Sequence, residues 1–111
     1  MPDVISLLTA VDRLAARLRA LPQSALERGA AAEGLALARE LSLRAQRLEA
    51  PEREPLEMPD AGIFAVGDQL AVAGHDLAEA LRTAGTAGTE RTEAELVESV
   101  RRVTAMAESI P

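Results

Sequence analysis

The chain has 111 residues, with twelve Arg, no Lys, eighteen acidic residues and a net charge of −6 at pH 7, and this acidic balance disfavours nucleic acid as a partner. It contains no Cys, which excludes disulfides, thiolate metal sites and cysteine nucleophiles. Phe64 is its one aromatic residue, so the core must come from closely packed helices rich in Leu, Ala and Val. A chain of this length fits a single domain, residues 1–111.

The first predicted helix covers about residues 3–21. Its apolar residues are spaced alternately by three and four positions, which is the pattern of a helix packed lengthwise on other helices. The positions are Val4, Leu7, Val11, Leu14, Leu18 and Leu21. Asp3 is expected to cap the amino end of this helix, and Pro22 ends it.

The second predicted helix covers about residues 24–49 and opens with Ser24 and Glu27 at the spacing of a capping box. One side of it carries the seam that faces the core. Leu35, Arg39 and Leu43 lie away from that seam. Because no helix of a four-helix bundle is central, apolar residues on two sides of a helix indicate contact with a second molecule, and self-association through this face is expected. Ordinary, scattered surface leucines are the alternative.

Residues 50–60 form the one substantial predicted loop, rich in Pro and Glu. Three prolines and four acidic residues among these eleven forbid a helix and keep the segment solvated. We expect a crossover linker, with recognition as an extended peptide as the alternative.

The third predicted helix covers about residues 60–84 and carries two stripes. Large residues form the first, which faces the core. Small residues, Gly67, Ala71, Gly74 and Ala78, form the second, and they would let a neighbouring helix approach unusually closely. That neighbour is either a helix of the same chain or one from a partner.

The only histidine, His75, lies beside the small stripe on the same side as Phe64 and Asp68. Asp68 is about 10 Å from it along the helix axis, too far for one metal ion, whereas Glu79 is one turn away. We expect an exposed His75–Glu79 pair, with Asp12 and Asp76 as nominal candidates for any further ligands. The common zinc, phosphate-loop and serine-nucleophile motifs do not occur, so no metal, no cofactor and no catalytic residue are predicted.

The last predicted helix covers about residues 90–110, capped by Thr89 or Thr92. The fold expected from these segments is all-α, an antiparallel four-helix bundle in up-down-up-down order, with the 50–60 loop joining two hairpins. A dimer is the structural alternative. The amino-terminal segment lacks the basic start of a secretory signal, and no apolar run is long enough to span a membrane, so a cytoplasmic protein without membrane contact is expected.

The predicted function is that of a small, non-enzymatic protein–protein interaction or scaffolding module, acting as a homodimer or on a protein partner. The predicted interaction face consists of Leu35, Arg39, Leu43, Phe64, Gly67, Ala71, Gly74, His75 and Ala78. The alternative is a small-molecule or metal-binding protein with a site near Phe64, Asp68 and His75. A third possibility, an acidic regulator of a basic partner, follows from residues 49–111, which hold five Arg against thirteen acids.

Overall fold

The structure is a computed structural model that describes residues 3–85 and 90–111. Within these residues it is all-helical, and four long helices pack against one another, so the prediction of an all-α four-helix bundle is confirmed. The long helices are α1 (Val4–Ala20), α3 (Ala31–Glu49), α4 (Val66–Gly85) and α5 (Glu90–Ser109). Short elements precede two of them: α2 (Gln23–Ala25) and the π-helical turn η1 (Leu26–Ala30) before α3, and the 3-10 turn η2 (Ile63–Ala65) before α4.

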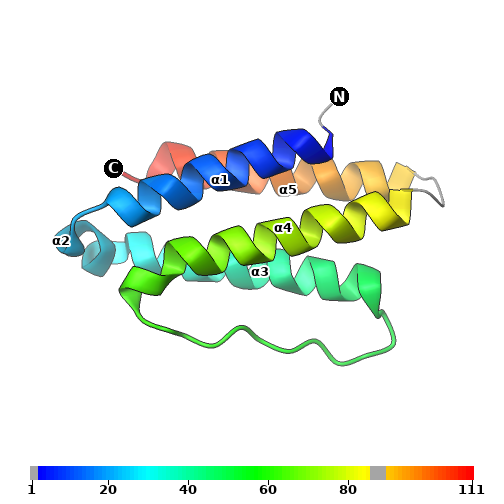
Figure 1. The fold of residues 1–111 in the computed structure, drawn as a ribbon, viewed down its shortest axis with the longest axis horizontal. Coiled ribbons are helices and arrows are strands. Elements are labelled where there is room, and N and C mark those ends of the chain that lie inside the picture. The colour runs from blue at the N-terminus through cyan, green and yellow to red at the C-terminus, as the bar shows by residue number, and fades with distance from the viewer. Residues whose placement is uncertain (1–2, 86–89) are drawn as a thin grey trace.

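The four helices form two layers, with α1 and α4 nearer the viewer and α5 and α3 behind them (Figure 1). α4 packs against α1 on one side and α3 on the other, and α5 packs against both α1 and α3. The largest fully buried side chains come from all four helices and include Leu14, Leu41, Leu77 and Val103. The apolar seams predicted from their spacing therefore meet in one core.

The predicted up-down-up-down order is wrong, because α3 and α4 run in the same direction (Figure 1). At their starts Gly34 lies against Val66, and at their ends Leu48 and Thr83 line the same hollow. Between them the chain returns along α3, where Arg39 binds the carbonyl oxygen of Met58. The helix order is up-down-down-up.

The length of the connection explains this order. The connection runs from residue 50 to residue 62, between the end of α3 and the start of η2. Thirteen extended residues reach about 43 Å, more than the roughly 28 Å length of α3. We call residues 50–62 the strap. It contains the predicted 50–60 loop and extends two residues further, so it can bring α4 back to the start of α3.

The helix starts follow the sequence in part. Asp3 caps α1 as predicted, its Oδ1 accepting the backbone N–H of Ser6 at 2.8 Å. Ser24 lies inside α2, which begins after Pro22 and has no side-chain cap, so the predicted capping box does not form. Gly29 interrupts the predicted 24–49 helix with a φ of 148°, a conformation open to glycine and strained for other residues. Thr89 lies outside the described residues, and Thr92 lies within α5.

Across residues 3–85 and 90–111, no helix combines the length and the apolar character needed to cross a membrane.

Candidate interaction surface

The small stripe of α4 is the contact with α1. A Cβ added at Gly74 would overlap the side chain of Val11, and one added at Gly67 would lie 3.0 Å from the carbonyl oxygen of Ala15. Ala78, on the same stripe, is buried, and Ala71 is partly buried. A helix of the same chain occupies the space beside Gly67 and Gly74, so these two glycines and the buried Ala78 do not offer a surface to a partner. This corrects their assignment to the interaction face.

The polar residues beside the small stripe bind α1 as well. His75 Nε2 lies 2.8 Å from Asp12 Oδ1, and Arg19 Nε donates to Asp68 Oδ1 at 2.7 Å. The predicted pairing of His75 with Glu79 is wrong. Because the glycines let α1 come close, the Asp12 carboxylate reaches the imidazole, and Glu79 instead accepts a hydrogen bond from Arg82.

The region predicted as an alternative metal or ligand site has no converging ligands. His75 is 53% exposed on its side chain and has one carboxylate partner. Phe64 lies in η2, before α4, and is 68% exposed. Among the residues that the structure describes, no group of three or more His, Cys, Asp or Glu side chains could hold a metal ion.

The outer face of α3 has a different environment, because the strap lies along it. Leu35 is buried, while Arg39 and Leu43 are partly exposed. Arg39 Nε donates to the carbonyl oxygen of Met58 at 2.8 Å. Part of the face that the sequence predicted to contact a second molecule is therefore covered by this chain's own strap.

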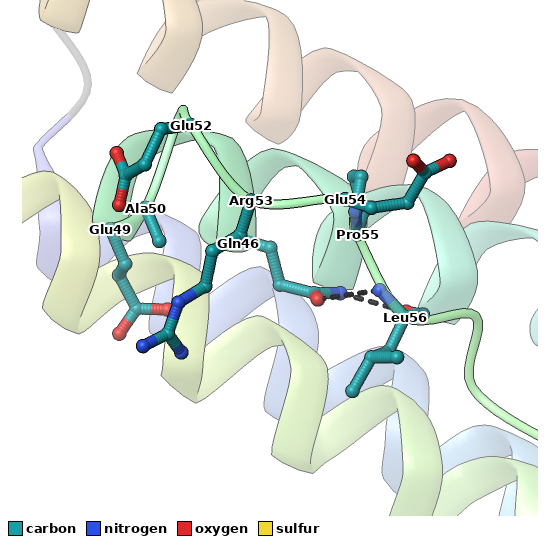
Figure 2. A pocket seen from close by; sticks show the side chains of 8 residues that line it. All are labelled: Gln46, Glu49, Ala50, Glu52, Arg53, Glu54, Pro55 and Leu56. Carbon is teal, nitrogen blue, oxygen red and sulfur yellow. Dashed lines mark hydrogen bonds between the residues drawn. The ribbon is translucent and has the colours of Figure 1, made fainter.

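Gln46 holds the strap at Leu56 through both ends of its side-chain amide. Its Nε2 donates to the Leu56 carbonyl oxygen at 2.9 Å, and its Oε1 accepts the Leu56 backbone N–H at 2.8 Å (Figure 2). The amide takes the place that a neighbouring strand would take in a β-sheet. Further along, Gln69 of α4 donates to the carbonyl oxygen of Pro59 at 2.8 Å. These bonds hold an extended segment in place although it has no secondary structure of its own.

The side chains of the strap point to different sides. In Figure 2 the Arg53 side chain extends toward the side of Glu49, whereas the carboxylate of Glu54 points the other way. Leu56 is 81% exposed although its backbone is held on both sides. The strap thus presents an aliphatic side chain and carboxylates to solvent on a fixed backbone.

Two hollows meet at Leu43. The first, of about 310 Å³, lies between α3 and the strap. Its apolar lining consists of Ala36, Leu43, Pro55 and Leu56, and its polar lining of Arg39, Glu40 and Glu57. The second, of about 840 Å³, lies between α3 and α5 and also includes Leu43 and Glu40. Leu43 and Glu40 therefore form a ridge between the two hollows.

The second hollow is lined by arginine, and we call it the arginine cleft. Its charged residues are Arg44, Arg47, Arg91 and Arg102 with Glu40 and Glu95, and Leu43, Leu48 and Pro51 complete the lining. The antiparallel packing of α3 and α5 brings these residues together from distant parts of the sequence. Four guanidinium groups against two carboxylates leave an excess of positive charge on a protein whose net charge is −6.

Half of these arginines are neutralised within the cleft. Arg44 pairs with both Glu40 and Glu95, and its side chain is only 19% exposed. Burial by itself would lower the pKa of Arg44, but the hydrogen bonds that its guanidinium donates to Glu95 and Glu40 outweigh burial and raise the pKa. Arg102 pairs with Glu40 at 3.3 Å.

The other two arginines provide the unbalanced charge. Arg47 and Arg91 are exposed, and neither has a carboxylate partner in the part of the chain that the structure describes. Sequence reasoning missed both. The excess of seven Arg over five acids in residues 1–48 was a signal for Arg47, but Arg91 lies in the acidic half of the chain, where no such signal exists.

No family model matches the chain, and neither the curated proteins nor the solved structures contain a match to it.

Proposed function

We propose that this protein is a non-enzymatic protein-interaction module, and that its contact surface is the outer side of α3. This α3 surface consists of the Leu43 and Glu40 ridge, the strap on one side and the arginine cleft on the other. The observation that carries the proposal is Leu56, an exposed aliphatic side chain on a backbone that Gln46 holds from both sides. Pre-ordering a contact segment lowers the entropy lost on binding.

The chemistry of the surface supports binding rather than catalysis. Arginine stays protonated at neutral pH, so it positions charge without transferring a proton. Exposed aliphatic side chains beside charged groups are the composition of a contact patch with an apolar centre and a polar rim. Aliphatic side chains and charged groups both line the two hollows that meet at Leu43.

Photo-crosslinking from Leu43 tests the proposal. A benzophenone amino acid replaces Leu43 in the protein as it is expressed in its native cell, and irradiation then captures whatever lies against the ridge. The matched control carries the same group at Ala16, an exposed position on α1. We expect a discrete adduct from position 43 and none from position 16. Equal labelling from both positions, or no adduct from position 43, would overturn the proposal.

A further inference from the structure

We propose that the partner at the α3 surface is a second copy of this chain, bound about a two-fold axis so that the strap of each copy lies against the arginine cleft of the other. This inference rests on the proposed function and names the partner of the same surface. It follows from the charges of the strap and the cleft, from their positions on either side of one ridge, and from the bonds that hold the strap.

The strap and the cleft have opposite charge. The strap carries Glu52, Glu54, Glu57 and Asp60 against Arg53, and residues 51–57 are all exposed. The cleft carries two more arginines than carboxylates. A surface that presents both signs side by side fits another surface of the same kind.

The positions of the two regions suit a two-fold interface. In such an interface the same patch is used on both copies: if one residue contacts a second residue of the partner, that second residue contacts the partner's copy of the first. The patch must therefore complement itself. Pro51 lines the arginine cleft and Leu56 lines the apolar hollow, so the strap borders both, while the ridge separates the hollows. An axis passing near Leu43 would place the strap of one copy opposite the cleft of the other. The two Leu43 side chains would then lie near the centre of the contact.

The strap is not placed to neutralise the cleft of its own chain. Gln46 holds Leu56, Arg39 holds Met58, and Gln69 holds Pro59, so its middle and end stay on the far side of the ridge. Arg47 and Arg91 are exposed and have no carboxylate partner among residues 3–85 and 90–111, so they are open to carboxylates of a second copy.

A charge exchange between two variants tests the inference. One variant carries R47E and R91E in the cleft, and the other carries E52R and E54R in the strap. All four side chains are exposed, so both variants should keep the helical circular dichroism of the wild type. The masses of each variant and of their equimolar mixture are measured by light scattering in low salt, where exposed charges are least screened.

The wild type should form a dimer, and each variant alone should self-associate at least about tenfold more weakly, because both contacts then bring like charges together. The mixture should recover the dimer, because each cleft then meets a strap of opposite charge. A control variant with R13E and R28E, both exposed on other elements, has the same charge change as the cleft variant and should remain dimeric.

Three results would overturn the inference: a wild type that stays monomeric at low salt, variants that dimerise as well as the wild type, or a mixture that does not recover the dimer. Crosslinking separates this failure from that of the proposed function. If Leu43 yields an adduct with a different protein while the wild type is monomeric, the second copy is excluded and the interaction surface stands. If there is neither adduct nor dimer, both proposals fail.

Discussion

The small stripe of α4 and the outer face of α3 looked alike in sequence, since both carry residues unlike those of an ordinary solvent-facing helix side, but the fold uses them differently. The stripe around Gly74 is filled by Val11 of α1, inside the bundle. The face around Leu43 stays at the surface, between the strap and the arginine cleft.

The difference follows from the side chains that the α4 stripe and the outer face of α3 present to a neighbouring helix or chain. Glycine removes the ridge of side chains that separates helices. A stable contact there therefore needs a neighbouring helix that places its own side chain in the gap. Val11 does so within the chain. Leu43 and the exposed Leu56 project their own apolar surface, and arginines and carboxylates surround them. Small residues mark the internal contact, and we propose that projecting aliphatic residues among charges mark an external one.

The largest effect should come from breaking the internal contact. Gly74→Leu places a side chain where even a Cβ overlaps Val11, so α1 and α4 must separate. We expect a loss of about 3 kcal/mol in the free energy of unfolding, measured by urea denaturation with circular dichroism. Gly85→Leu is the matched control, because a Cβ there meets nothing within 4 Å. Equal losses for the two variants would contradict the close contact between α1 and α4.

A smaller effect should come from releasing the strap. Gln46→Ala removes both hydrogen bonds to Leu56, which together stabilise the fold by about 1 kcal/mol because they lie near solvent. The Leu56 amide should then exchange with solvent faster, as measured by hydrogen exchange. Gln23→Ala is the control, since the Gln23 side chain donates to the nearby Glu27 side chain and not to the strap. If the exchange of the Leu56 amide is the same in the wild type and Gln46→Ala, the strap is not held as described.

The smallest effect concerns an ion pair at the edge of the arginine cleft. Hydrogen bonds from Arg101 and Arg102 lower the pKa of Glu98 from 4.5 to about 2. Because this pKa is lower in the folded chain than in the unfolded one, the stabilisation is complete above pH 4.5 and is lost as the pH falls toward 2.

We therefore expect the melting temperature of the wild type to fall more steeply between pH 4.5 and pH 2 than that of Glu98→Gln. The difference should be small, because the group is exposed. Glu108→Gln changes another exposed carboxylate of α5 and should follow the wild type. If the melting temperatures of the wild type and Glu98→Gln fall equally over this pH range, the pair of Glu98 with Arg101 and Arg102 does not form in solution.

The sequence predicted the features that depend on local pattern. Spacings of three and four placed Leu7, Val11 and Leu14 in the core, and Asp3 marked the start of α1. These predictions succeed because helix periodicity and capping depend on residues one or two turns apart.

Features that depend on the arrangement of the helices could not be read in this way. Nothing local shows whether residues 50–62 turn back at once or run the length of α3, so the direction of α4 was predicted wrongly. The same uncertainty hid the pairing of His75 with Asp12, which needs the register between α1 and α4. It also hid the arginine cleft, because Arg44 meets Glu95 only after α3 and α5 pack side by side.

We propose that the α3 surface, unlike the α4 stripe, binds a second copy of this chain, and the most direct test of this is the mass of the protein in solution. Light scattering with refractive-index detection suits a chain without Trp or Tyr. The mass is measured over a range of concentrations for the wild type and for Leu43→Asp. We expect a wild-type mass of twice 11.7 kDa and a Leu43→Asp mass of 11.7 kDa. A wild type that remains at 11.7 kDa at every concentration, or a Leu43→Asp variant as heavy as the wild type, would contradict this proposal.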